Sequence, residues 1–363
     1  ELVIDLLSKA FPSNYYANKE KFKKITAFNE NNTWHIVFVK NKLIGALLTK
    51  DIILNYFGSK FLGCGMSYMA IDPEYQSMTV SKILKKCLED KSNKKDLTIG
   101  FARKVMDGYW KPYGFLGISN FSKSEFLLSD IRVNEANSDI EIIRYNHSYL
   151  KRLKDIYNQD NIYLAGNFYR NKSHWNDIFF HKEKTDCFVF NYKNQFVGYM
   201  FVKKNIINEF KFNPLFYKEI IRGIKIHFSN NSHEKIVFEL NLNSPILNFL
   251  KQYSFSEYKR YAFEGGHIVK ITSYKKILEK LSPSLLFKIK SANLMPFTLN
   301  VYNVDIIFDG KKLSFKFNET YSLSLSDQFN LTKLIFGLHN SEEIKVKIMF
   351  PNSNFQVPFY DEV

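Results

Sequence analysis

One strand-to-helix turn has the residue types of an anion-binding loop. Residues 68–71 form an apolar stretch typical of a strand, and residues 83–88 place apolar side chains at helical spacing. A proline-marked turn and the polar residues 76–81 lie between them. A helix N-terminus presents unpaired N–H groups and about half a unit of positive charge, so it can hold a pyrophosphate. The alternative is an ordinary turn in which Ser77 or Thr79 caps the helix.

The sulfur and imidazole side chains are too scattered for a metal centre. Cys64, Cys87 and Cys187 are an odd number without the paired spacing of a zinc site or a redox dithiol. The eight histidines are equally scattered along the chain. We therefore expect buried, reduced thiols and no metal.

An internal repeat supplies the elements that would position this turn. Residues 35–50 contain two apolar runs around a polar turn, with Gly45 in the second run, which is typical of a β-hairpin. Residues 187–203 repeat the pattern with Gly198. Two further landmarks recur in the same order, a proline-marked turn (Pro73 and Pro214) and an aromatic-rich turn (residues 109–115 and 249–255). The order predicts two tandem copies of one α/β unit, each with a hairpin, strand, helix, strand and final helix.

The pattern changes after a last predicted strand at residues 267–271. Residues 274–281 predict a helix that ends at the break of Pro283. Alternating apolar residues then predict antiparallel strands at residues 297–308, 313–317 and 321–325, and a helix follows with Leu331, Leu334, Ile335 and Leu338 on one face. We expect a third, smaller α+β domain.

Length and composition agree with a globular protein of several domains. The chain has 363 residues, is 45% hydrophobic and 24% charged, and so resembles neither a disordered nor a fibrous protein. No apolar run approaches the roughly 20 residues of a membrane span, and no signal-peptide pattern follows Glu1, so we expect a cytoplasmic protein. The net charge of +15 favours anionic partners. A compositional bias of the source genome toward lysine and asparagine would produce the same excess of positive charge without selection for binding.

The order of features resembles the GNAT superfamily of acyl-CoA-dependent N-acetyltransferases. That family has Gln or Arg, two residues, Gly, one residue, and Gly or Ala at the phosphate loop, and an aromatic motif ending in Gly-Phe later. Residues 76–81 match at Gln76 and at Ser81, but Thr79 replaces the first glycine. Because glycine lets the backbone approach the pyrophosphate closely, a Cβ at Thr79 should weaken or reshape the site.

The plan of the whole chain is similar to the enhanced intracellular survival family of N-acetyltransferases. The resemblance implies a first GNAT domain at residues 1–133, a second at 134–278 with residues 217–222 in place of a phosphate loop, and a sterol-carrier-like domain at 279–363. Residues 169–175 resemble that family's Arg-to-Trp segment. The implied fold class is α/β (α+β), two tandem GNAT folds with mixed sheets and a small α+β domain.

The resemblance also implies an acyl-CoA site. Backbone groups of the strand would bind the pantetheine arm, and the loop would hold the pyrophosphate of acetyl-CoA. The implied cofactor-binding residues are Met69, Ala70, Ile71, Gln76, Ser77, Met78, Thr79, Val80 and Ser81.

Two catalytic roles follow from the resemblance. The family's general acid, a tyrosine, falls on Trp110, whose indole N–H has negligible acidity, so we assign Trp110 to substrate binding and take Tyr109 as the candidate acid. Water could also protonate the thiolate. The family's base is the C-terminal carboxylate, which would be that of Val363, with Asp361 and Glu362 as alternatives if the chain ends there.

The leading hypothesis is an N-acetyltransferase that transfers acetyl from acetyl-CoA to a primary amine by direct attack. The amine would belong to an amino sugar, an aminoglycoside or a lysine-like group. A degenerate GNAT-fold protein that binds or assembles without catalysis is the alternative, motivated by Thr79 and Trp110. Nucleic-acid binding rests on charge alone, so we expect no nucleic-acid partner. The resemblance further implies a homo-oligomer, either a trimer or a hexamer.

Overall fold

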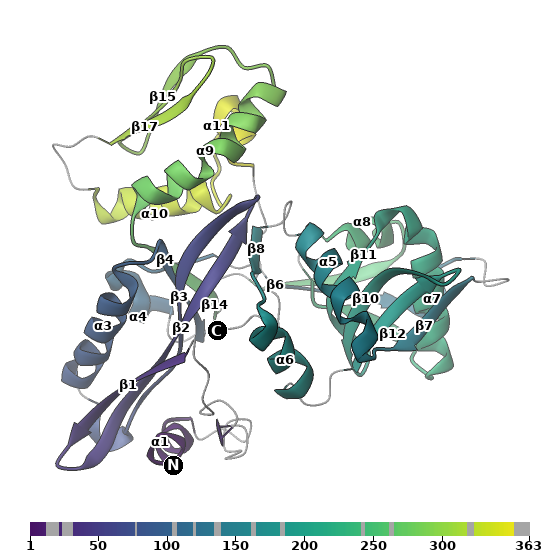
Figure 1. Ribbon diagram of the computed structural model, residues 1–363, viewed down its shortest axis with the longest axis horizontal. Coiled ribbons are helices and arrows are strands. Elements are labelled where there is room, and N and C mark those ends of the chain that lie inside the picture. The colour runs from purple at the N-terminus through teal and green to yellow at the C-terminus, as the bar shows by residue number, and fades with distance from the viewer. Residues whose placement is uncertain are drawn as a thin grey trace.

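Three packed parts make up the protein in a computed structural model (Figure 1). The structure describes residues 1–11, 22–23, 32–76, 78–103, 107–118, 121–133, 139–160, 165–181, 186–240, 244–260, 265–317 and 323–351. Two seven-stranded sheets form the two larger parts, and a three-stranded sheet with helices forms the third.

The first sheet has the order β1-β2-β3-β4-β14-β5, with β8 also paired to β2. Its strands are β1 (Asn32–Val39), β2 (Lys42–Tyr56), β3 (Ser59–Ile71), β4 (Leu97–Arg103), β5 (Leu116–Gly117), β8 (Ala165–Phe168) and β14 (Gly265–Ile271). Its helices are α1 (Leu2–Ala10), α3 (Met78–Ser92) and the short α4 (Asp107–Trp110). The apolar side of α3, with Val80, Leu84 and Leu88, packs on this sheet.

The second sheet has the order β13-β6-β12-β11-β10-β9-β7. Its strands are β6 (Phe121–Leu127), β7 (Ile140–Arg144), β9 (Asp186–Tyr192), β10 (Gln195–Lys203), β11 (Ile206–Phe212), β12 (Lys235–Phe238) and β13 (Phe255–Arg260). The helices around it are α5 (Leu150–Asp160), α6 (Lys172–His181), α7 (Tyr217–Asn230) and α8 (Pro245–Leu250).

The two sheets exchange one strand each. β6 follows β5 in the chain but lies between β12 and β13, whereas β14 follows β13 but lies between β4 and β5. In Figure 1, β6 extends from the first sheet toward the second. The expected boundaries at 133/134 and 278/279 stay predictions; the sheets themselves do not divide along the first of them.

Backbone register confirms the predicted repeat. Gly45 pairs with Ile71, directly before the first proline turn, and Gly198 pairs with Phe212, directly before the second. Asp72 Oδ1 accepts a hydrogen bond from Glu74 N at 3.1 Å, and Asn213 Oδ1 accepts the equivalent bond from Leu215 N at 3.1 Å. The hairpin turns agree as well, because both use a Lys-Asn pair with positive φ (Lys40 and Asn41, Lys193 and Asn194).

The C-terminal part corrects two expectations. Helix α9 (Tyr274–Ser291) continues through Pro283, because apolar residues on both sides of the proline are buried, and this packing outweighs the lost hydrogen bond: Ile277, Leu278, Leu281, Leu285 and Ile289. The expected strand at 321–325 is also wrong where the structure describes it. Ser324 Oγ accepts from Asp327 N at 3.1 Å and caps helix α10 (Leu325–Ile335), while residues 321 and 322 lie outside the described residues.

The remaining elements of this part are β15 (Phe297–Val301), β16 (Val304–Phe308), β17 (Leu313–Phe317) and α11 (Ile344–Met349). Helix α9 joins their core to the first sheet, since one buried cluster includes Leu54 and Ile99 of that sheet together with Leu281 and Phe336. The C-terminal part therefore folds against the sheet that carries the candidate site.

Candidate active site

Strands β3 and β4 separate beside the predicted turn. They pair in parallel only from Gly63 with Leu97 to Met66 with Gly100, although β3 continues to Ile71 and β4 to Arg103. Beyond Met66, β3 remains paired with β2 on its other edge. The last residues of β3 therefore have no partner from β4 among the described pairings.

A β-bulge lies at this separation. Tyr68 has φ of 48°, and the β2–β3 register shifts between Ala46 and Leu48. After the bulge, Ala70 is buried against α1, whereas Met69 and Ile71 are partly buried on the side of α3. Of the predicted strand residues, Met69 and Ile71 thus lie on the side of the candidate loop, and Ala70 contributes to the core behind it.

Asp72 fixes the turn that follows β3. Its carboxylate lies 3.8 Å from Lys9 Nζ and 3.5 Å from Lys42 Nζ. Burial alone would raise the pKa of Asp72, but the hydrogen bond from Glu74 and the two lysines together hold it below its ordinary value. The ionised carboxylate therefore anchors the short 3-10 helix η1 (Pro73–Tyr75) ahead of α3.

The predicted loop residues differ in position. Gln76 and Thr79 are exposed, Ser81 is half-buried, and Val80 packs into the core beneath α3. Ser77 lies outside the described residues, as does the side chain of Met78. In the second part, 3-10 helix η6 (Pro214–Phe216) runs directly into α7, so no intervening loop exists there.

The aromatic turn brings the candidate acid next to α3. Tyr109 is half-buried, and Trp110 is 6% exposed and packs edge-to-face on Phe115 at 5.3 Å. The burial of Trp110 leaves little of its surface for a substrate, and its binding role stays a prediction. Val363 lies outside the described residues, so the structure does not place the candidate base.

Solved structures share this architecture over nearly the whole chain. A GCN5-related N-acetyltransferase from Anabaena variabilis has a TM-score of 0.70 at 12% identity, covering 99% of this chain and 96% of that one. A probable N-acyltransferase from Enterococcus faecalis has a TM-score of 0.67 at 15% identity, covering 98% and 95%. Eis1 from Mycobacterium abscessus has a TM-score of 0.62 at 10% identity, covering 99% and 96%. No family model matches the chain, and no curated protein matches its sequence.

The chain has the GNAT fold. Two mixed sheets built on one repeated plan make it a tandem arrangement of that fold. At identities of 10–15% this likeness establishes the architecture alone.

Sequence reasoning missed Lys85 on α3. Its side chain is 6% exposed, and its Nζ lies 3.9 Å from the ring centroid of Tyr109 and 3.4 Å from that of Tyr113. The sequence did contain an indication of this burial, because Lys85 lies within the apolar pattern of Val80, Leu84 and Leu88, whose positions face the core.

The segment at 169–175 has a structural role. Arg170 makes two hydrogen bonds to Glu209, at 2.9 and 2.6 Å, and Tyr199 donates to the same carboxylate at 2.6 Å. Both charged side chains are almost completely buried. This buried, paired network therefore holds the segment that follows β8 against β10 and β11.

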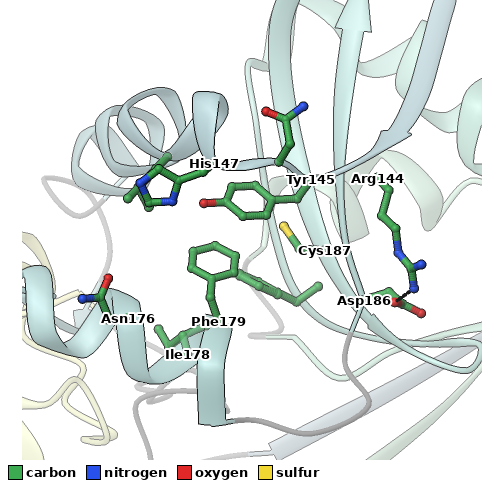
Figure 2. A pocket seen from close by; sticks show the side chains of 11 residues that line it. Arg144, Tyr145, His147, Asn176, Ile178, Phe179, Asp186 and Cys187 are labelled. Atoms are coloured by element: carbon green, nitrogen blue, oxygen red, sulfur yellow. Dashed lines mark hydrogen bonds and ion pairs between the residues drawn. The ribbon is translucent and has the colours of Figure 1, made fainter.

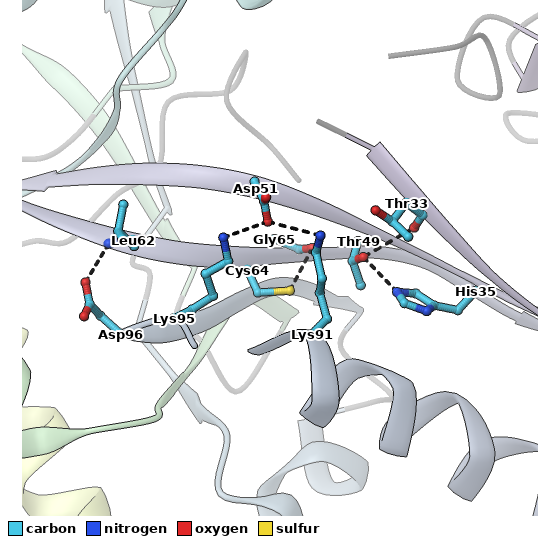
Figure 3. A network of polar contacts seen from close by, with 10 residues as sticks. All are labelled: Thr33, His35, Thr49, Asp51, Leu62, Cys64, Gly65, Lys91, Lys95 and Asp96. Atoms are coloured by element: carbon cyan, nitrogen blue, oxygen red, sulfur yellow. Dashed lines mark hydrogen bonds and ion pairs between the residues drawn. The ribbon is translucent and has the colours of Figure 1, made fainter. Parts of the chain in front are cut away.

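The three cysteines are free thiols, as predicted, and two of them are buried. Cys64 and Cys187 are buried, and Cys87 is partly buried. Burial raises the pKa of Cys64 to about 11, even with Lys91 and Lys95 nearby, which pair with Asp51 (Figure 3). With this raised pKa, Cys64 is protonated at neutral pH and is a poor nucleophile.

A cavity of about 410 Å³ lies in the second part, between α5, α6 and the sheet. Figure 2 shows the Tyr145 ring facing Phe179, with its hydroxyl directed to the side where His147 lies. Arg144 and Asp186 form an ion pair at the opposite side, and burial raises the pKa of Cys187 well above its ordinary value. The Cys187 thiol is protonated, and Arg144 and Asp186 neutralise each other, so these groups do not supply a nucleophile or a base for acyl transfer in this cavity.

Among the described residues, no group of three His, Cys, Asp or Glu side chains is arranged to hold a metal ion. Within the same residues, no helix has the length and apolar character needed to span a membrane.

Proposed function

We propose that the protein is an acyl-CoA-dependent N-acyltransferase that moves an acetyl group from acetyl-CoA to a primary amine. The observation that carries the proposal is the separation of β3 and β4 after Met66 and Gly100, beside the N-terminus of α3. A thioester arm is extended and amide-rich, so it can pair with strand backbone. Its pyrophosphate would then lie at the helix N-terminus, where backbone N–H groups favour anions.

The proposed reaction is a direct transfer. The amine nitrogen attacks the thioester carbonyl carbon, a C–N bond forms, the C–S bond breaks, and CoA leaves as a thiolate that takes up a proton. Backbone N–H groups near residues 69–71 would polarise the carbonyl oxygen. Tyr109 is the proposed acid toward the thiolate, and the carboxylate of Val363 the proposed base toward the amine, if the chain ends there.

Charge limits the choice of amine. A protein with a net charge of +15 repels polycations at long range, so an aminoglycoside or lysine-rich acceptor requires a local acidic pocket. Within the proposal, an amino sugar with a single amino group is the acceptor class least opposed by this field. We further propose that the protein is a cytoplasmic homo-oligomer. We also propose that its C-terminal part is a sterol-carrier-like domain.

Two measurements test the function. Calorimetry with CoA should show saturable binding, and mass spectrometry of reactions with acetyl-CoA and a panel of amines should show products heavier by one acetyl group. Absence of both CoA binding and acetylated product would refute the enzyme.

A binding or assembly protein without catalysis is the second candidate. The burial of an indole at position 110 favours it, because this side chain cannot donate the proton that a tyrosine would. Tight CoA binding with no turnover on any amine would favour this candidate over the enzyme.

A further inference from the structure

Lys85 is a buried cation that lies against the faces of aromatic rings. Its Nζ has no hydrogen-bond partner among the described residues and is shielded from water. It lies against Tyr113 at 3.4 Å and Tyr109 at 3.9 Å, with the Trp110 ring at 5.9 Å. We call these three rings the aromatic cage.

The aromatic cage leaves the hydrogen-bonding capacity of the ammonium unmet. An ammonium has three donors and no acceptor, and a ring face offsets only part of the cost of removing it from water. By contrast, Lys42 pairs with Glu74, and Lys91 and Lys95 pair with Asp51. Lys85 is buried without a carboxylate partner among the described residues, so its ammonium keeps the capacity to bind an added anion.

Helix geometry gives Lys85 access to the start of α3. Lys85 and Ser81 are four residues apart, so they lie on one face of the helix, separated by a rise of about 6 Å. Long side chains on a helix lean toward its N-terminus, and a four-carbon stem covers about this distance. A rotamer change can move the ammonium from the aromatic cage to the first turn without moving the backbone.

We propose that Lys85 is a phosphate-binding residue that leaves the aromatic cage and pairs with the diphosphate of CoA at the first turn of α3. The inference rests on the proposed function, because it presumes that CoA binds at this turn. A charge-assisted bond to phosphate is stronger than a ring contact, so the exchange is favourable when the anion is present. The two tyrosine faces are then open to the bound nucleotide.

The test is calorimetry with CoA, dephospho-CoA and pantetheine on the wild type, Lys85→Met and Lys85→Arg. Lys85→Met keeps the length and apolar packing of the stem, and Lys86→Met, an exposed position on the same helix, is the matched control. We expect Lys85→Met to weaken CoA and dephospho-CoA alike by about tenfold to a hundredfold, with pantetheine unchanged. Lys85→Arg should restore most of the affinity, and Lys86→Met should match the wild type.

The outcomes separate this inference from the proposed function. Wild-type protein that binds none of the three compounds refutes the function itself. Wild-type binding of CoA with equal affinity in Lys85→Met refutes the role of Lys85 alone. A loss confined to CoA would assign the contact to the 3′-phosphate and overturn the diphosphate contact, and an equal loss for pantetheine would mark Lys85 as structural. Unchanged thermal unfolding of the variants shows that they are folded.

Discussion

At the scale of single residues, Tyr109 is the proposed acid, and the adjacent Trp110 has an indole N–H of negligible acidity that cannot take this role. We expect Tyr109→Phe to lower the rate constant of acetyl transfer by about a hundredfold, because phenylalanine cannot protonate the departing thiolate. Trp110→Tyr and Trp110→Phe lose similar packing against Phe115, and we expect their rate constants to be equal, because Tyr109 supplies the proton in both. The comparison requires steady-state rates at saturating acetyl-CoA.

A gain at position 110 would contradict the assignment of Tyr109. If Trp110→Tyr is about a hundredfold faster than Trp110→Phe, the transfer lacks an acid until a phenol is introduced at position 110. Equal rates in all three variants would mean that water protonates the thiolate and that neither side chain is the acid.

At the scale of elements, Gly45 sets the distance between β2 and α3. A Cβ at this position would lie 2.7 Å from Val80 Cγ1, and a β-branched side chain has little freedom to move aside. We expect Gly45→Ala to destabilise the fold by about 1–3 kcal/mol through overpacking, measured by urea unfolding. It should also weaken CoA binding, because α3 carries the candidate phosphate turn.

The double variant Gly45→Ala/Val80→Ala tests that cause. Removing the valine methyls relieves the contact, so the double variant should be more stable than the sum of the two single changes implies. Strict additivity would show that α3 does not rest on Gly45.

Helix α9 carries a second element-level prediction. Lys288 is half-buried between the Phe57 ring, 4.1 Å from its Nζ, and the carbonyl of Met349, and burial lowers its pKa from 10.5 to about 8. Below pH 8 both folded and unfolded chains carry the proton, and the folded state bears the full cost of burying the charge. Between pH 8 and 10.5 only the folded state releases the proton, so stability rises with pH.

The variant Lys288→Met should remove this rise. We expect the difference in unfolding free energy between Lys288→Met and wild type to shrink by on the order of 1 kcal/mol from pH 8 to 10. The difference is needed because burial raises the pKa of Tyr274 to about 12, which lowers stability at high pH in both proteins alike. A difference that stays constant with pH would show that Lys288 is protonated throughout.

At the scale of the whole molecule, the exchange of β6 and β14 makes the two sheets depend on each other. A fragment of residues 1–133 contains β4 and β5 but lacks β14, which pairs with both. We expect this fragment to show no cooperative unfolding by circular dichroism, whereas co-expression with residues 134–363 should yield a folded complex.

Residues 134–278 provide the matching control, because their sheet lacks β6 between β12 and β13. We expect this fragment to be unfolded as well. Cooperative unfolding of either fragment alone would show that the exchanged strand is dispensable and that the predicted boundary marks an independent domain.

The repeat, the hairpins and the proline turns followed from the amino-acid sequence, because each depends on residues a few positions apart. The Lys-Asn turns and the Asp72 and Asn213 caps are such local features, and apolar periodicity identified most helices and strands. The predicted helix break at Pro283 was wrong, because the burial of apolar residues on both sides of the proline outweighs its local preference to end a helix.

Only the tertiary structure decided which sheet receives β6 and β14, where β3 leaves β4, and what surrounds Lys85. The composition of a strand predicts that it will pair with other strands. It does not predict which ones, because the possible partners here are distant segments of similar composition. The aromatic cage likewise forms only where α3 and α4 meet, so a lysine in an apolar pattern marked the position without revealing its neighbours. Local chemistry thus determined the elements, and the geometry of their packing determined the site.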